Sequence, residues 1–155
     1  MAFEWRKYKP LLKYHRIFVL SIVFTYILYK YANLGENDKY DNGQIKHDGR
    51  RENGFNEGRW IWFYQNGKRQ MEGFFKKGKR YGKWLMYNND GILINERNYD
   101  NDKLNGEFTD WNDNGTLKSE GQFHEDALHG FIKNYNSEGK LIKQENFENG
   151  IKKEK

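Results

Sequence analysis

Hydrophobic and polar positions follow a strict repeat of 24 residues along most of the chain. Glycine opens each clear unit, and the opening residues are Gly58, Gly82, Gly106 and Gly130. Self-similarity at a fixed period indicates an array of structural repeats. The pattern predicts two regions, an N-terminal segment over residues 1–33 and a repeat domain over residues 34–155. The predicted units are 34–57, which is degenerate, followed by 58–81, 82–105, 106–129 and 130–153.

Each unit has the pattern of one β-hairpin. In the unit that opens at Gly82, two β-prone runs flank Asn88-Asn89-Asp90-Gly91, and Asp100-Asn101-Asp102 closes the unit. Asn or Asp before Gly is the strongest short signal for a hairpin turn. We therefore expect an all-β fold, in which the hairpins join as a single-layer antiparallel meander.

Alternation with a period of two predicts which side chains share a face of this sheet. In the second strand of a unit, Leu93, Arg97 and Tyr99 have the same parity. Gly73 and Gly121 lack a side chain and leave room for a neighbouring ring. An apolar residue stands two positions after each opening glycine, and these residues are Trp60, Trp84, Phe108 and Ile132.

An apolar run of 13 residues, 17–29, follows a basic N-terminus. As a helix it would rise about 20 Å, which is short of the ~30 Å hydrocarbon core of a bilayer. Tyrosines and basic residues at both ends could extend the span. We expect an N-terminal hydrophobic helix that anchors the chain, built from Ile17, Phe18, Val19, Leu20, Ile22, Val23, Phe24, Ile27 and Leu28.

Charge placement predicts the orientation of this anchor. Basic residues precede the run, so a single-pass span would keep the N-terminus in the cytoplasm and place the repeats outside it. Two alternatives stay open: a cleaved signal peptide with secretion of the repeats, and a buried core helix. Lys30 makes a poor cleavage site before Ala32, and the run has no polar stripe.

The formal net charge of +5 comes from the N-terminal segment alone. Residues 34–155 contain 21 basic and 21 acidic side chains, so the repeat domain is neutral in sum. Binding to nucleic acid requires basic residues clustered on the folded surface, and the composition gives no argument for it. Cysteine is absent, which removes disulfides and thiolate metal sites.

No motif predicts catalysis, and we expect no cofactor. Glu72, Glu96 and Glu120 recur at one repeat position, where we expect them to pair with Lys and Arg across strands. Asp110 begins a stretch similar to a calcium-binding loop, but the glutamate needed at its twelfth position is replaced by Gly121. The sequence therefore favours a non-catalytic protein without a metal site.

The motif Gly82-Lys-Trp84-Leu-Met-Tyr87-Asn-Asn-Asp-Gly91, continued at Leu117-Lys-Ser-Glu120-Gly121-Gln-Phe123, resembles the bacterial variant of the MORN repeat. The resemblance covers residues 40–151 and extends to the YwqK family of antitoxin or immunity-type proteins. It implies a MORN-type hairpin array that binds a partner, with a cognate toxin as one candidate.

The aromatic residues carry the binding hypothesis, because Trp and Tyr dominate protein–protein hot spots. Binding of a protein partner is the leading function. The alternatives are a structural envelope protein that contacts lipid or cell-wall polymer, and a carbohydrate binder. The open sheet edges predict self-association as well. The expected partner-binding residues are Trp60, Trp62, Trp84, Tyr87, Trp111 and Tyr135.

Overall fold

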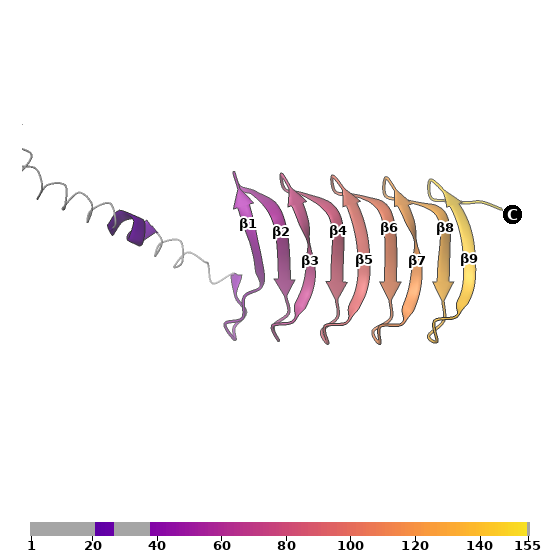
Figure 1. Ribbon diagram of the computed structural model, residues 1–155, viewed down its shortest axis with the longest axis horizontal. Coiled ribbons are helices and arrows are strands. Elements are labelled where there is room, and N and C mark those ends of the chain that lie inside the picture. Colours follow the sequence, from indigo (N-terminus) through magenta and orange to yellow (C-terminus); the bar gives the residue numbers. More distant parts are fainter. Residues whose placement is uncertain (1–20, 27–37, 155) are drawn as a thin grey trace, which may run out of the picture. The chain divides into compact units, whose positions relative to one another are not determined.

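The structure is a computed structural model that describes residues 21–26 and 38–154. The chain forms two compact units, Met1–Lys39 and Tyr40–Lys155. The second unit is one antiparallel sheet (Figure 1). Its ten strands are β1 His47–Glu52, β2 Phe55–Phe63, β3 Arg69–Lys76, β4 Lys79–Tyr87, β5 Leu93–Asp100, β6 Lys103–Trp111, β7 Leu117–His124, β8 Ala127–Tyr135, β9 Leu141–Glu148 and β10 Ile151–Lys152.

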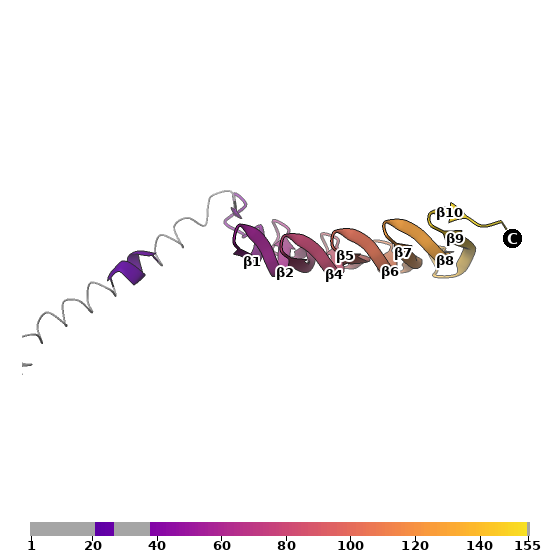
Figure 2. The ribbon, with the colours of Figure 1, turned by 90° about the horizontal axis from the view of Figure 1, so that it is seen from above.

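The strands lie in the sheet in their order along the chain, from β1 to β10. Viewed from above, they form one layer (Figure 2). The predicted antiparallel meander of hairpins is confirmed. Since sequence order equals spatial order, any change in residue type along the chain becomes a change along the sheet.

Tight two-residue turns close the hairpins between β3 and β4, β5 and β6, and β7 and β8. Both central residues have positive φ, as in Lys77 (51°) and Gly78 (79°). Asp102, with φ 75°, takes the place that Gly78 holds in the preceding unit. Its Oδ1 accepts hydrogen bonds from the backbone N of Arg80 (2.9 Å) and from Arg80 Nε (3.1 Å). The aspartate therefore fixes this turn against the preceding hairpin, which a glycine could not do.

Wider turns at the opposite end are linked from repeat to repeat. The Tyr40 hydroxyl donates to the carbonyl of Phe63 (2.9 Å), and one repeat later the Tyr64 hydroxyl donates to the carbonyl of Tyr87 (2.7 Å). These bonds join neighbouring hairpins through groups that the sheet ladder does not use. They add to the nearest-neighbour coupling on which a repeat array depends.

A β-bulge near the end of each first strand changes the predicted faces. The register shifts between Met86 and Tyr87, so that Leu93 pairs with Tyr87. Directly paired residues share a face, and Leu93 therefore lies on the face opposite to Arg97. The expectation that these two share a face is wrong, because the bulge interrupts the period of two.

The predicted N-terminal helix has little support. The described part of that segment is a helix over residues 21–26 only. Ile22, Val23 and Phe24 lie in it with 51%, 47% and 61% of their surface exposed, and the other predicted anchor residues lie outside the described residues. Within residues 21–26 and 38–154, no helix combines the length and the apolarity needed to cross a bilayer.

Candidate functional site

Four large apolar side chains form the core, and all lie on one face of the sheet, which we call the tryptophan face. They hold the first-strand position of successive repeats and are only 3–7% exposed: Trp60, Trp84, Phe108 and Ile132. The opposite face carries Glu72, Glu96 and Glu120, and we call it the glutamate face. The prediction that these apolar positions are equivalent is confirmed.

Glycines on neighbouring strands make this thin core possible. A Cβ built on Gly73 would overlap the ring of Trp84, and one built on Gly49 would overlap the ring of Trp60. At Gly121 an added Cβ would meet Phe108 and Ile132. A bulky side chain on one strand thus alternates with a glycine on the next strand, and each bulky side chain lies directly on the backbone of that glycine. The expectation that Gly73 and Gly121 leave room for rings is confirmed.

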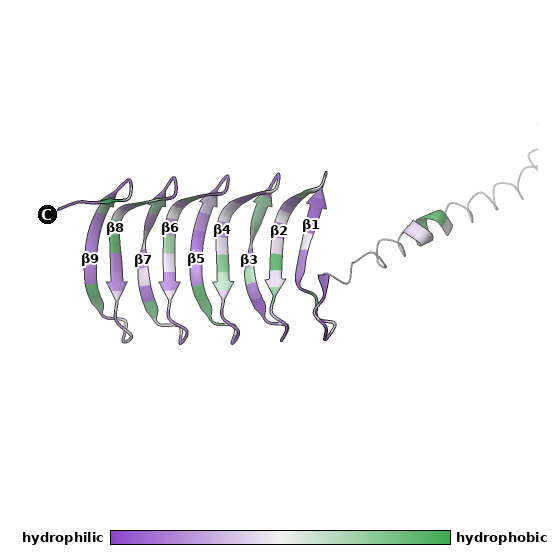
Figure 3. Cartoon of the chain, turned by 180° about the vertical axis from the view of Figure 1, so that it is seen from behind, coloured by the Kyte–Doolittle hydropathy of each residue, from purple (hydrophilic) through white to green (hydrophobic). Residues whose placement is uncertain are grey.

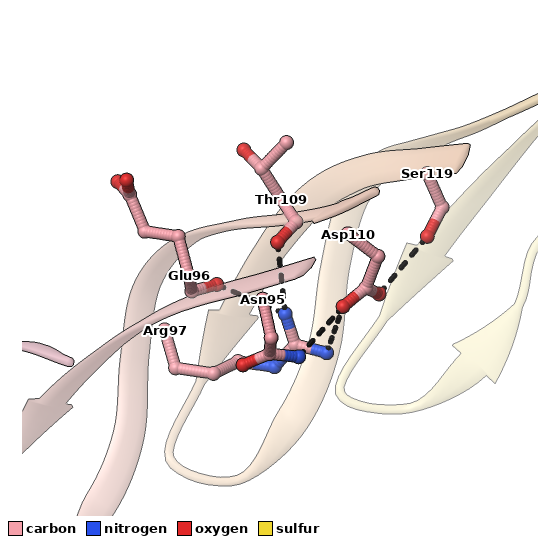
Figure 4. Close-up of polar contacts among 6 residues, drawn as sticks. All are labelled: Asn95, Glu96, Arg97, Thr109, Asp110 and Ser119. Carbon is pink, nitrogen blue, oxygen red and sulfur yellow. Dashed lines mark hydrogen bonds and ion pairs between the residues drawn. The ribbon is translucent and has the colours of Figure 1, made fainter. Parts of the chain in front are cut away.

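Arg97 takes the glycine position between Trp84 and Phe108 and interrupts this alternation. Its guanidinium carbon lies 4.9 Å from the centroid of the Phe108 ring, and its Nη2 lies 2.8 Å from Asp110 Oδ1. Asn95 Nδ2 also donates to Asp110 Oδ1 (2.7 Å), and Ser119 Oγ donates to Oδ2 (3.0 Å). Figure 4 shows these side chains converging on Asp110 from neighbouring strands. From β6 towards β9 the tryptophan face keeps its core row, with Phe108 and Ile132, but the position beside that row is polar, with Asp110 and Asn134.

An aromatic cluster covers the same face on the other side of Arg97. Trp62 lies between Trp60 and Trp84, at 5.7 Å from each ring centroid. Phe75 meets the Trp84 ring edge-on at 5.0 Å, and Tyr99 does so at 6.0 Å. Edge-to-face pairs of this kind add to the stabilisation that burial provides. The cluster extends from β2 to β5 and is half open to solvent.

The cluster forms a hollow of about 390 Å³ on the sheet surface. Met86 stands at its margin, 42% exposed. The guanidinium carbon of Arg80 lies 4.1 Å from the Tyr99 ring centroid, so a cation stands on the aromatic wall. The residues that line the hollow are Trp62, Met71, Phe75, Arg80, Trp84, Met86, Asn95, Arg97 and Tyr99.

Charge divides the sheet at the same place. Residues 38–87 contain twelve Lys or Arg and six Asp or Glu, whereas residues 88–155 contain nine and fourteen. The neutral total of the repeat domain therefore combines a basic half with an acidic half. In Figure 3, β5 at this border is predominantly hydrophilic, and hydrophobic stretches lie on both sides of it, in β2–β4 and in β6 and β8.

On the glutamate face, the recurrent carboxylates are paired as expected. Glu72 accepts hydrogen bonds from Arg59 and from the Tyr87 hydroxyl (2.9 Å), and Arg69 lies 3.4 Å away. Burial alone would raise the pKa of Glu72, but the bonds from Arg59 and Tyr87 outweigh it and hold this pKa below its ordinary value. Burial and the Glu72 carboxylate together raise the pKa of Tyr87.

Glu120 repeats this arrangement two units later in a more open form. Hydrogen bonds from Lys133 (2.9 Å) and from the Tyr135 hydroxyl (2.8 Å) lower its pKa. Lys83 pairs with Glu96 at the corresponding place in the unit between them. Each carboxylate of this series therefore has a cation beside it. The pKa values of Glu72 and Glu120 are lowered, whereas a general acid requires a raised one.

The six sequence-predicted site residues do not form one surface. Trp60, Trp62 and Trp84 lie on the tryptophan face, and two of these rings are core, at 3% and 5% exposure. The other three lie on the glutamate face: Tyr87, Trp111 and Tyr135. Tyr87 and Tyr135 use their hydroxyls within the glutamate pairs. Of the three tryptophans on the tryptophan face, only Trp62 is accessible to solvent.

Several residues of the hollow were not among the predicted contacts. Met71 and Phe75 have the parity of Gly73 within β3, and Arg80 and Met86 have the parity of Trp84 within β4, so alternation could have placed them on this face. The contact between Arg80 and Tyr99 could not be found in this way, because it depends on pairing between units. In the described part of the chain, no group of three His, Asp or Glu side chains is arranged to hold a metal ion.

Strand order, tight turns and a glycine-spaced core define a hairpin-repeat protein. Residues 56–77, 80–101 and 104–125 match the MORN repeat variant. These three segments cover β2 to β7 and are similar to arrays that bind other molecules or membranes. No curated protein matches the chain.

Proposed function

We propose that this protein is a non-catalytic adaptor that binds a protein partner through the hollow on its tryptophan face. The observation that carries the proposal is the half-open cluster around Trp62, Phe75 and Met86. Tryptophan and methionine side chains on an open surface are typical of protein contacts, since they bury a large area and adapt to a partner's shape.

The polar groups support a binding role over catalysis. Glu72 and Glu120 are held as ion pairs with lowered pKa values, whereas a general acid requires a raised one. Asp110 accepts three hydrogen bonds from neighbouring strands. These groups stabilise the sheet and leave its aromatic surface to make contacts.

The resemblance to antitoxin and immunity-type proteins suggests the partner's role. In this more specific form of the proposal, the partner is a toxin that the array neutralises, and the apolar run over residues 17–29 holds the array at a membrane. The repeats then face away from the cytoplasm, as the basic residues before the run predict. Both statements extend beyond the geometry of the sheet.

A capture experiment tests the binding role. The C-terminally tagged chain is solubilised from native cells in detergent, and proteins that co-purify are identified by mass spectrometry. Met86→Asp introduces into the hollow the residue that Asp110 provides at the same repeat position. Asn134→Asp makes a similar change in the last repeat and serves as the matched control.

One stoichiometric partner that is lost with Met86→Asp and kept with Asn134→Asp supports the proposal. Capture that Met86→Asp leaves unchanged contradicts the use of the hollow. If no protein co-purifies while the chain binds lipid vesicles or cell-wall polymer, the envelope alternative replaces the adaptor. Toxicity of the partner in cells that lack the array would establish the neutralising role.

A further inference from the structure

Asparagine followed by glycine recurs along the array, and this dipeptide has a reactivity of its own. The backbone N of the glycine can attack the side-chain carbonyl carbon of the asparagine, because glycine has no side chain that hinders the approach. Whether an individual pair reacts depends on how firmly the fold holds its two amide groups. The six pairs begin at Asn42, Asn53, Asn66, Asn105, Asn114 and Asn149.

The wide turns hold both amide groups. At Asn66, the side-chain Nδ2 donates to the carbonyl of Asn89 in the next repeat (2.9 Å), and the backbone N of Gly67 donates within the turn (2.9 Å). Corresponding bonds to the asparagine side chain and from the glycine N hold the turns at Asn42 and Asn114. A backbone N–H that donates a hydrogen bond is not free to lose its proton or to turn towards the side chain. We therefore expect the pairs in the wide turns to be protected.

The tight turns differ from one another by one hydrogen bond. In the last hairpin, the N of Gly150 donates to the carbonyl of Leu128 in the preceding unit (2.9 Å). In the hairpin of β1 and β2, the N of Gly54 donates to no described residue, and the side chain of Asn53 makes no hydrogen bond there either. A Cβ built on Gly54 would have no atom of a neighbouring element within 4 Å, so the turn is uncovered as well.

The position of this turn in the sheet adds to its freedom. Both residues have positive φ, 50° at Asn53 and 83° at Gly54, and the side chain must rotate towards the glycine N before the two can react. Among the described strands β1 pairs only with β2, whereas β6, which contains the pair at Asn105, lies between two strands. The end of a repeat array opens at a lower free energy than its interior. Hydrogen bonding and strand order thus distinguish the same asparagine.

We propose that Asn53 is a site of spontaneous modification, which proceeds through a cyclic imide. The deprotonated N of Gly54 forms a bond to Cγ of Asn53, and the side-chain nitrogen leaves as ammonia. Water then opens the ring at one of its two carbonyl groups. One opening gives aspartate. The other gives isoaspartate, in which the backbone runs through the former side chain and is one carbon longer.

The two products have different consequences for the hairpin. Aspartate fits the turn, since the same repeat position holds a carboxylate side chain at Glu125, with φ 49°. Isoaspartate adds a backbone carbon to a two-residue turn and disrupts the pairing of β1 with β2 that follows it. Trp60 then loses the backbone of Gly49 beneath its ring and the carbonyl of Arg50 that accepts from its Nε1 (3.1 Å). The isoaspartate form therefore uncovers the first ring of the core.

Reaction rates measured site by site test this assignment. The full-length protein in detergent is incubated at mildly alkaline pH, with and without urea, and the six Asn-Gly peptides are followed by mass spectrometry after digestion. In urea all six should react at similar rates, because they share one dipeptide. In the folded chain we expect Asn53 to react ~5-fold faster than Asn149, whose turn has one additional hydrogen bond, and at least ~10-fold faster than Asn66.

Substitutions copied from another repeat test the opening of the hairpin. Asn53→Lys removes the amide and gives the turn the residue that Lys77 provides at the same position, with φ 51°. During incubation we expect the tryptophan emission of the original chain to shift to longer wavelength as isoaspartate accumulates, and that of Asn53→Lys to stay constant. Asn149→Lys is the matched control in the last turn and should change as the original chain does. Asn53→Asp, measured before incubation, should have the emission of the original chain.

Protection of Asn53 in the folded chain equal to that of Asn66 overturns the proposal, as does faster conversion at any of the other five sites. If isoaspartate forms at Asn53 and the emission does not change, the turn accommodates the additional carbon and the opening of the hairpin is wrong. Circular dichroism before incubation shows whether each variant folds. The comparison of rates within the original chain needs no variant and decides the assignment by itself.

Discussion

The two halves of the tryptophan face share a backbone and a core row but differ in the side chains beside that row. In β1–β4 the face is aromatic, with Trp62 and Met86 at the position next to the core. In β6–β9 the same position holds Asp110 and Asn134, within an acidic half. The difference shows which residues specify the hairpin and which are free to change. Turn residues, the core row and its facing glycines keep the fold, and the positions beside them determine what the surface contacts.

Each half also stabilises itself by different interactions. In the aromatic half, rings lie on glycine backbone and on one another, as Trp84 does on Gly73 and beside Phe75. In the polar half, Phe108 and Ile132 still pack on Gly121, and the Asp110 carboxylate adds a network with Asn95, Arg97 and Ser119. A sheet without a second layer buries little area. The contacts between side chains on its face, ring packing as well as the polar network, therefore contribute a large part of its stability. Four sets of substitutions test this comparison.

The largest effect is expected at Gly73. Gly73→Ala places a Cβ where the Trp84 ring lies, and that ring cannot move without losing contact with Phe75. We expect a loss of about 3 kcal/mol in the free energy of unfolding, the upper part of the range for overpacked cores. Urea unfolding measures the loss, and a Gly73→Ala protein as stable as the original would contradict the close packing.

Much of this architecture could be predicted from the sequence. The 24-residue period gave the units, the turns and the equivalence of Trp60 and Trp84, because each of these depends on local pattern. The division of charge could not be seen from the neutral total of the domain. It becomes significant only in a meander, where a change along the chain is also a change along the surface.

The burial of the predicted binding residues could not be inferred from the sequence. Trp60 and Trp84 were predicted to bind a partner, and a thin sheet uses its largest rings as its own core, so both are nearly buried. Tyr87 was predicted to bind the partner too, and its hydroxyl binds Glu72 on the other face. Aromatic content identifies positions that bury area, and it does not distinguish burial in the fold from burial by a partner.

The next largest effect is expected on the glutamate face, where the two halves also differ. Glu72 has 11% of its side chain exposed and Glu120 has 36%. Glu72→Gln leaves Arg59 without its carboxylate and should cost about 2 kcal/mol. Glu120→Gln should cost less, because its more exposed pair with Lys133 is screened by water.

Acid titration sharpens this difference. The folded-state pKa of Glu72 lies below its ordinary value, so the stabilisation is present above the ordinary pKa of glutamate and is lost as pH falls through the lowered value. The advantage of the original chain over Glu72→Gln should therefore be constant near neutral pH and shrink in acid. Thermal unfolding between pH 7 and pH 3 provides the measurement. An advantage that grows in acid would mean that the pKa is shifted in the opposite direction.

A third substitution breaks the polar network at the border of the halves. Arg97→Gln keeps part of the stem over Phe108 but removes the ion pair with Asp110. Both partners are largely buried, at 19% and 23% side-chain exposure, and we expect a loss of about 1.5 kcal/mol. Asp110→Asn and the double variant complete a thermodynamic cycle. Additive losses in that cycle would show that the two side chains do not stabilise each other.

The smallest effect separates two tryptophans that occupy the same repeat position. Trp60 Nε1 donates to the carbonyl of Arg50 (3.1 Å), whereas the buried Nε1 of Trp84 has no hydrogen-bond partner in the described part of the chain. Replacement by Phe, which Phe108 shows to be compatible with this position, removes a similar area from both sites. Only Trp60→Phe also loses a hydrogen bond, while Trp84→Phe removes a buried donor that was unsatisfied. Since a neutral hydrogen bond contributes about 1 kcal/mol, we expect Trp60→Phe to be the less stable variant by about that amount.

Urea unfolding of the two variants side by side gives the difference directly. The opposite order would show that Trp84 makes a contact, to water or to the backbone, that stabilises the aromatic half more than its ring packing alone.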